Sequence, residues 1–504
     1  MPLLDPAICH LAIATRDPRF DGVFFLGVIT TGIYCRTICR ARRPKPENCR
    51  FFAHPASAEA AGFRPCLLCR PGLAPGYAPV DAGATLARIA VRALESGALA
   101  DGEKLETLAT SLGITTRHLR RVVGEHLGAS PVALAQTWRL LMARRLLQET
   151  PLPVSQIALA SGFRSLRRCN ALFKARYGMT PSAFRRPSGK AIVGPRETNL
   201  PSVVLAESLS LTLSYRPPFA WQELLRYFMG RAIPGVEAIT PERYARTFHL
   251  GGQSGWIAVT HQAATHRVRV EVAPSLTGVL PQLLAAIRRS FDLDAAPHDI
   301  AEVLEPDPLL QLSVRETPGL RLPGAIDPFE TAVRTIIGQQ VSVAAATTVM
   351  GRIVQAFGGS ILTPWPELNR LTLTPARLAQ ESIDTLAPLG LNSARAGALL
   401  TLSRSLIEGK ISLRPSADPE RAMARLQELP GIGPWTAHYF GMRILGWPDA
   451  FIGGDLVVKK ALAPLTPRQI EARSAAWRPW RGYAVMHLWH STGFFKTNAR
   501  PATS

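Results

Sequence analysis

The sequence predicts a multidomain, mostly α-helical protein with a small cysteine-rich α/β domain at its start and a short α+β unit in its middle. A chain of 504 residues is too long to fold around one hydrophobic core. Its 47% hydrophobic and 19% charged residues are typical of globular domains. Apolar residues recur at helical spacing over most of the chain, outside the cysteine-rich start and one stretch of alternating residues.

Changes in composition divide the chain into four expected domains. The first is rich in Cys, Arg and Pro and ends in a Pro/Gly stretch, which continues neither a helix nor a strand. The second is all-α and is followed by a polar linker. The third mixes helices with the alternating strand pattern HRVRVEV, and the fourth is all-α with Gly/Pro turns. The expected domains are residues 1–78, 81–186, 202–285 and 286–498.

The net charge indicates the class of binding partner, and the first residues indicate the cellular compartment. A formal net charge of +21 indicates a polyanionic partner, because neutralising phosphates releases condensed counterions. Membrane binding is disfavoured, since no run of about 18 apolar residues and no basic amphipathic end is present. The start carries Asp5 and no apolar stretch after a basic region, so we expect a cytoplasmic protein. In that reducing compartment the seven cysteines are expected as thiols rather than disulfides.

Two short-spaced cysteine pairs predict a metal site. Cys35 and Cys39 form one pair, and Cys66 and Cys69 form the other. Four thiolates at such spacing suit one tetrahedral zinc ion. Spacing alone favours a closed, structural site. The alternative is a reactive site, because zinc keeps a sulfur deprotonated and nucleophilic at neutral pH.

The surrounding residues favour the reactive alternative. TTGIYCRTIC and AGFRPCLLC resemble the N-terminal zinc domain of the Ada methylation-response proteins over nearly all of residues 1–78. The resemblance implies that Cys35 accepts a methyl group from a DNA methylphosphotriester. Methylating one of four zinc-bound thiolates changes the formal charge from about −2 to −1, which lowers repulsion from DNA. The basic residues beside the cluster, which either hold the phosphate or only solvate the loop, are Arg36, Arg40, Arg42 and Arg43.

Two blocks in the second domain each place an apolar helix, a Gly turn and a basic helix in series. They are LETLATSLGITTRHLRRVVGEHLG and PVSQIALASGFRSLRRCNALFKARYGMTP. Together they resemble the AraC-type helix-turn-helix domain over about residues 83–186, which implies promoter DNA as a partner. Cys169 stands where that family usually has an aromatic residue. The arginines expected to contact DNA, unless they only solvate the helices, are Arg117, Arg120, Arg121, Arg164, Arg167 and Arg168.

The last domain contains the hairpin LPGIGPW, in which Gly431 and Gly433 let the backbone approach a phosphate. Asp455 follows in FIGGDLVVKKAL, and LWHSTGFF adds late aromatic residues. With LTLSYRPPFAWQELLRYF and GLRLPGAIDPFETAVRTIIGQQVSV, these motifs resemble the helix-hairpin-helix glycosylases, specifically the AlkA-type 3-methyladenine DNA glycosylase II. The resemblance runs from about Leu211 to the C terminus.

The resemblance implies a catalytic carboxylate at Asp455, which would stabilise an oxocarbenium-like state and orient water. Capping of the following helix is the alternative role, and both roles are compatible in one residue. Trp435 stands where relatives that also cut the backbone carry a lysine, so a monofunctional enzyme without a lyase step is expected. Because no cysteine follows Cys169, we expect neither an iron–sulfur cluster nor an O6-alkylguanine transferase.

An aromatic slot is expected to receive the damaged base. Electron-rich rings favour a cationic N-alkylated purine through stacking and cation–π attraction, whereas the alternative is that these rings are core residues. The matching positions are Trp435, Tyr439, Trp489 and Tyr227. Relatives fill the gap left by the flipped base with an apolar residue, but Gln340 occupies that position here. Leu456 replaces an aromatic residue, so the range of lesions stays open.

Two functions are therefore expected in one chain. The leading one is hydrolytic removal of alkylated purines from double-stranded DNA, combined with methylphosphotriester sensing and transcription regulation. The alternative is a methylation-responsive regulator whose C-terminal half is an inactive glycosylase-like DNA clamp. Asp455 distinguishes them, since a clamp needs no carboxylate after the hairpin. The expected partners are double-stranded, alkylated and promoter DNA, with no membrane, and the protein is expected to be a monomer.

Overall fold

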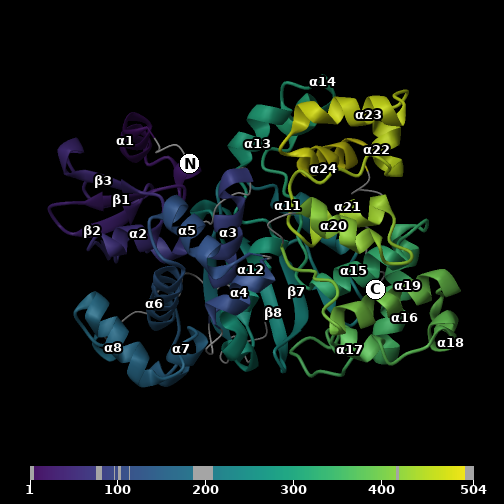
Figure 1. Ribbon diagram of the computed structural model, residues 1–504, viewed down its shortest axis with the longest axis horizontal. Coiled ribbons are helices and arrows are strands. Elements are labelled where there is room, and N and C mark those ends of the chain that lie inside the picture. The colour runs from purple at the N-terminus through teal and green to yellow at the C-terminus, as the bar shows by residue number, and fades with distance from the viewer. Residues whose placement is uncertain are drawn as a thin grey trace. The chain divides into compact units, whose positions relative to one another are not determined.

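The computed structural model describes residues 5–74, 82–95, 97–99, 104–112, 114–185, 208–415 and 419–493. Helices dominate, as predicted, and strands are confined to two regions (Figure 1). The first compact unit comprises residues 1–217, 262–285 and 293–295, and the second comprises residues 218–261, 286–292 and 296–504. The predicted linker RPSGKAIVGPRETNLPS, residues 186–202, lies outside the described residues. No helix in the described ranges has both the length and the apolar character needed to cross a bilayer.

A four-stranded sheet organises the cysteine-rich region. The strand order is β3-β1-β2-β4, in which β1 is antiparallel to both of its neighbours and β4 is parallel to β2. Its elements are α1 (Pro6–Thr15), β1 (Phe25–Val28), β2 (Ile33–Arg36), β3 (Cys49–Phe52), α2 (Pro55–Ala60) and β4 (Arg64–Pro65). Phe25, Tyr34, Phe52 and Phe63 form the buried core of this region.

Side-chain caps determine where the two basic helices of the next region begin. Thr115 Oγ1 accepts a hydrogen bond from the His118 amide at 3.2 Å, and Ser165 Oγ accepts one from the Arg168 amide at 3.2 Å. Both helices end at a glycine with positive φ. The helices are α3 (Ala82–Glu95), α4 (Leu105–Ser111), α5 (Thr116–Leu127), α6 (Pro131–Glu149), α7 (Val154–Ala160), α8 (Leu166–Tyr177) and α9 (Pro181–Phe184).

The predicted strand in HRVRVEV is β9 (Arg267–Val272), and its three valines are fully buried. In the first unit β9 pairs antiparallel with β5 (Leu209–Ser214). In the second unit β7 (Arg243–Leu250) pairs antiparallel with β6 (Glu237–Ile239) and with β8 (Gln253–Gln262). Alternation along the sequence therefore predicted the buried face of β9 correctly.

Helices account for most of the second unit. Their apolar faces enclose a core that includes Ile336, Met350, Leu399 and Phe440, all fully buried. The helices from α11 onward are α11 (Trp221–Met229), α12 (Leu280–Ser290), α13 (Pro297–Leu304), α14 (Pro308–Glu316), α15 (Pro328–Ile337), α16 (Val343–Phe357), α17 (Pro375–Leu378), α18 (Ile383–Leu386), α19 (Ser393–Ile407), α20 (Pro419–Gln427), α21 (Pro434–Arg443), α22 (Leu456–Ala461), α23 (Pro467–Ser474) and α24 (Arg481–Ser491).

Candidate active site and metal centre

The four cysteine sulfurs predicted to bind zinc lie together in the first unit. The Sγ atoms of Cys35, Cys39, Cys66 and Cys69 are all within 4.8 Å of one another. Zinc–sulfur bonds of about 2.3 Å in a tetrahedron place the sulfurs about 3.8 Å apart. The 4.0 Å between the sulfurs of Cys39 and Cys66 is close to that value. The cluster fits one zinc ion, as the spacing predicted.

Arg36, beside the cluster, is engaged inside the protein. Its side chain is 2% exposed, and its Nε donates to Asp21 Oδ1 at 2.8 Å. Its Nη1 donates to the Cys69 carbonyl at 3.3 Å. Both alternatives predicted for Arg36, a phosphate ligand and a solvated loop residue, are wrong, because a buried ion pair occupies its guanidinium. The other arginines of this group are exposed: Arg40, Arg42 and Arg43.

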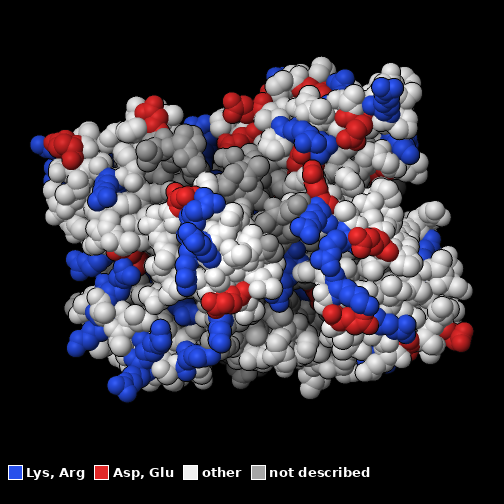
Figure 2. Space-filling model, viewed as in Figure 1, with Lys and Arg blue, Asp and Glu red and all other residues white. Residues whose placement is uncertain are grey.

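The arginines expected to contact DNA lie on or beside the second helix of each helix-turn-helix. All of them are exposed, with Arg117, Arg120 and Arg121 in α5, Arg167 and Arg168 in α8, and Arg164 just before α8. Arg121 pairs with Glu125 at 3.1 Å, an exposed contact that retains both groups at the surface. Figure 2 shows Lys and Arg side chains gathered over α8. These positions leave the basic face of α8 open to a polyanion.

A cavity of about 1380 Å³ lies in the second unit. Residues far apart in the sequence meet there, on α11, α21, α24 and the loops before α16, α21 and α22. The site residues predicted for the C-terminal half all line it: Tyr227, Gln340, Gly431, Gly433, Trp435, Tyr439, Asp455 and Trp489. The sequence suggested these residues separately, motif by motif. The structure shows that they line one cavity.

Asp455 precedes α22 and is held in one orientation. Its Oδ1 accepts hydrogen bonds from the amides of Val457 at 3.0 Å and Val458 at 3.1 Å, so the residue caps the helix. The indole Nε1 of Trp489 donates to the same oxygen at 3.0 Å. Within the described residues no hydrogen bond reaches Oδ2. The carboxylate is thus oriented through one oxygen and retains the other for a partner in the cavity.

The four predicted aromatic residues form two pairs. On α21, the rings of Trp435 and Tyr439 lie 5.3 Å apart at 24°, and both side chains are half-buried. Tyr227 and Trp489 are parallel within 10°, with ring centroids 6.5 Å apart, and they are only 0% and 2% exposed. Trp435 and Tyr439 are therefore the more exposed pair in the cavity lining, and Tyr227 and Trp489 are the buried pair.

Two arginines that the sequence analysis missed surround the tyrosines. Arg443 Nη1 donates to Tyr439 Oη at 2.9 Å and also to Tyr227 Oη, and the two hydroxyls are 3.2 Å apart. The guanidinium carbon of Arg231 lies 3.8 Å from the centre of the Tyr227 ring. Arg443 follows Tyr439 by four residues on one helix face, and that spacing was the available signal.

The guanidinium groups act differently on the two phenols. Burial raises the pKa of Tyr227 to about 12. Desolvation also opposes ionisation of Tyr439, but Arg443 and Arg231 outweigh it and hold the pKa of Tyr439 below its usual value. The two guanidinium groups therefore lie beside the phenols, and the Asp455 carboxylate accepts a hydrogen bond from Trp489 in the same cavity.

The hairpin before α21 depends on one glycine for its shape. Gly431 has φ +82°, and a Cβ at this position would lie 2.7 Å from the Cβ of Ala398. Gly433 has φ −81°, and a Cβ there would meet no atom within 4 Å. Gln339 Nε2 donates to the Gly431 carbonyl at 2.8 Å and so connects the hairpin to the loop that carries Gln340. Gln340 is exposed and has φ +56°.

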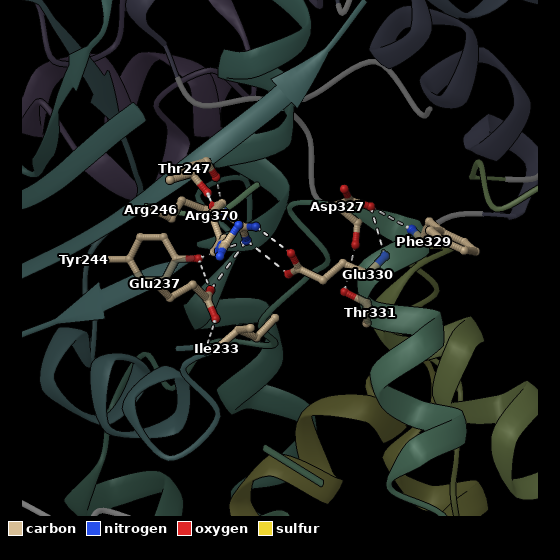
Figure 3. Close-up of polar contacts among 10 residues, drawn as sticks. All are labelled: Ile233, Glu237, Tyr244, Arg246, Thr247, Asp327, Phe329, Glu330, Thr331 and Arg370. Carbon is tan, nitrogen blue, oxygen red and sulfur yellow. Dashed lines mark hydrogen bonds and ion pairs between the residues drawn. The ribbon is translucent and has the colours of Figure 1, made fainter. Parts of the chain in front are cut away.

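A buried polar network supports the other end of the cavity (Figure 3). Arg246 on β7 donates from Nη2 to Glu330 Oε2 at 2.6 Å and from Nη1 to Glu237 Oε1 at 3.4 Å. Asp327 Oδ1 accepts from the amides of Phe329 at 2.9 Å and Glu330 at 3.0 Å, and so caps α15. The network fixes the start of α15, the helix that leads into the Gln340 loop.

Four family models match successive parts of the chain. Family models match the metal binding domain of Ada at residues 8–72, a helix-turn-helix domain at 108–187, the AlkA N-terminal domain at 210–327 and the HhH-GPD superfamily base excision DNA repair protein at 333–480. A solved 3-methyladenine DNA-glycosylase from Archaeoglobus fulgidus is 18% identical, with a TM-score of 0.48 over 56% of this chain and 99% of that one.

Two curated relatives are similar to this chain at higher identity. DNA-3-methyladenine glycosylase 2 of Escherichia coli is 36% identical over 56% of this chain and 98% of its own length. The probable bifunctional transcriptional activator/DNA repair enzyme AlkA of Mycobacterium tuberculosis is 36% identical over 493 residues, which are 95% of each chain. The chain therefore belongs to the family of bifunctional transcriptional activator/DNA repair enzymes AlkA.

Proposed function

We propose that this chain hydrolyses the N-glycosidic bond of alkylated purines in DNA, such as 3-methyladenine and 7-methylguanine, and leaves an abasic site without cutting the backbone. Its N-terminal half senses methylphosphotriesters and regulates transcription. Four domains carry these functions, at residues 1–78, 81–186, 202–285 and 286–498. The agreement of four family models with one chain and the cavity in the second unit support the proposal.

The arrangement of Asp455 carries the enzymatic part. Cleavage of the glycosidic bond develops positive charge on the deoxyribose, and a fixed carboxylate stabilises that charge without reorganising. Three donors orient Oδ1, so Oδ2 can face the sugar and a water molecule beside it. A residue that only capped α22 would not need the third donor, from Trp489. Both roles coexist in this side chain.

Stacking selects the base. Trp435 and Tyr439 offer half-buried faces at the cavity, and Tyr227 and Trp489 form the wall behind them. The ring centroids of Tyr227 and Trp489 are 6.5 Å apart. A planar base in contact with both rings would need a separation of roughly 7 Å, so this pair lies slightly too close to hold a base between its rings. Because Arg443 and Arg231 are close, shape and stacking contribute more to selectivity than cation–π attraction does. A cationic purine leaves as a neutral base and needs little protonation.

Base release from methylated duplex DNA by the wild type and by Asp455→Asn tests the enzymatic proposal. Asparagine retains the helix cap, so the variant should fold normally, which thermal unfolding would verify. Loss of the carboxylate charge should slow base release about 100-fold or more. Equal rates for the two proteins would leave the alternative, a regulator with an inactive DNA clamp.

Cys35 is the proposed methyl acceptor. Bound zinc would keep the four sulfurs deprotonated. Cys35 Sγ attacks the methyl carbon of a phosphotriester, the S–C bond forms, and the O–C bond breaks with its electron pair remaining on the phosphate oxygen. The helix-turn-helix arginines then contact promoter DNA. We further propose a cytoplasmic monomer.

A further inference from the structure

Leu456 is an apolar side chain exposed at the edge of the cavity. It is the first residue of α22, directly follows Asp455, and is 80% exposed. It lines the same cavity as Gln340 and Trp435. An exposed leucine is ordinary on a protein surface. Its position beside the carboxylate proposed for catalysis makes this one a candidate for contact with DNA.

The fold itself gives Leu456 no structural role. The Asp455 carboxylate caps α22, and Val458, which is fully buried, anchors the helix in the core. Lys459 and Lys460, three and four residues after Leu456, are also exposed and share its helix face. This face therefore combines one apolar group with two cations. That combination suits a duplex whose phosphates lie beside a disrupted base stack.

Gln340 can supply only one of the two contacts that a duplex with a flipped nucleotide requires. It is exposed in the loop between α15 and α16, with φ +56°, and its amide can hydrogen-bond the base left without a partner. A polar amide does not replace the stacking that is lost when a nucleotide leaves the duplex. Among the described residues, two large and exposed apolar side chains line the cavity and could make that contact, Val341 at 38% exposure and Leu456 at 80%, and Leu456 is the more accessible of them.

We propose that Leu456 provides this apolar contact by packing against the base pair next to the flipped nucleotide, while Gln340 fills the vacated position. The inference rests on the proposed glycosylase function and assigns the flipping step to two residues from different loops. Leu456 is a positioning residue in this scheme, because it stabilises the extrahelical nucleotide and does not touch the reacting bond. Its contribution should therefore appear in the flipping equilibrium.

The test measures flipping and base release separately. A duplex carrying 7-methylguanine next to 2-aminopurine reports unstacking through fluorescence, in an Asp455→Asn background that suppresses chemistry. Leu456→Ala should reduce the fluorescence change and, with Asp455 intact, slow single-turnover base release by about 10-fold. Leu456→Met should retain both. Adding Gln340→Leu to Leu456→Ala should restore part of the loss, because the apolar contact returns at the other position.

Leu362→Ala is the matched control, since Leu362 is 98% exposed and does not line the cavity. It should leave both measurements unchanged. If Leu456→Ala stays within twofold of this control while the wild type releases base, the inference is wrong and the glycosylase proposal stands. If the wild type releases no base, the glycosylase proposal is wrong. Fluorescence in the Asp455→Asn background then still decides whether Leu456 unstacks DNA.

Discussion

The two glycines of the hairpin occupy similar sequence positions but have different structural requirements. Gly431→Ala should destabilise the second unit by about 2–4 kcal/mol, because alanine strains at φ +82° and its Cβ would lie 2.7 Å from Ala398. Gly433→Ala should change stability by less than about 0.5 kcal/mol, since nothing lies within 4 Å of the new atom. It should still weaken DNA binding by covering the open backbone. Denaturant unfolding and DNA titration of both variants measure these effects. Equal destabilisation of the two variants would contradict both the strain at φ +82° and the crowding against Ala398.

At the scale of one element, the start of α15 makes stability depend on pH. Burial, and then the nearby carboxylate of Glu330, raises the pKa of Asp327 to about 6 from its ordinary value of 3.8. The folded protein binds this proton more tightly than the unfolded chain does. The stabilisation is therefore complete below about pH 3.8 and is lost as the pH rises through about 6. The shift corresponds to at most about 3 kcal/mol.

Asp327→Asn should remove this dependence while retaining the cap, because asparagine also caps helices well. The free energy of unfolding of the variant minus that of the wild type should rise by up to about 3 kcal/mol between about pH 4 and pH 7. Denaturant unfolding across this range measures the difference, and other titrating groups cancel in it. Asp384→Asn, which changes an exposed carboxylate in α18, is the control for replacing one carboxylate by an amide elsewhere in the protein. A difference for Asp327→Asn that does not change with pH would place the Asp327 pKa near its ordinary value.

Local sequence patterns predicted helices, strands and the cysteine cluster, but they did not predict contacts between residues far apart in the sequence. Alternation predicted β9, and cysteine spacing predicted the sulfur cluster. The pairing of Arg246 with Glu330 joins residues 84 positions apart, and no local period encodes such a pair. The same limit explains the error at Arg36, since Arg36 ends β2 and its partner Asp21 lies 15 residues earlier, before β1. Periodicity indicates which face of a helix or strand is buried, but it does not identify the residue that packs against that face.

At the scale of the whole molecule, the two candidate sites are complete within separate units. The cysteine cluster draws all of its sulfurs from the first unit, and the cavity residues all belong to the second. Each site can therefore be perturbed while the other serves as an internal reference. The net charge of +21 acts on both, because it attracts the same polyanion to either unit. A change of one charge at the cluster must be detected against that large background.

Methylation of Cys35 should lower the Kd for DNA, because it removes one negative charge from the cysteine cluster. One unit of charge about 4 Å from a phosphate is worth about 1 kcal/mol in water, or roughly 5-fold in Kd, and more where water is excluded. We expect this gain after incubation with methylphosphotriester DNA, with mass spectrometry confirming one methyl group at Cys35. The gain should shrink as salt rises, because screening weakens it. Cys49→Ser, outside the cluster, should behave as the wild type, and base release should not change. An unaltered Kd at every salt concentration, with Cys35 fully methylated, would exclude an electrostatic switch and leave Cys35 as a methyl acceptor whose charge does not regulate DNA binding.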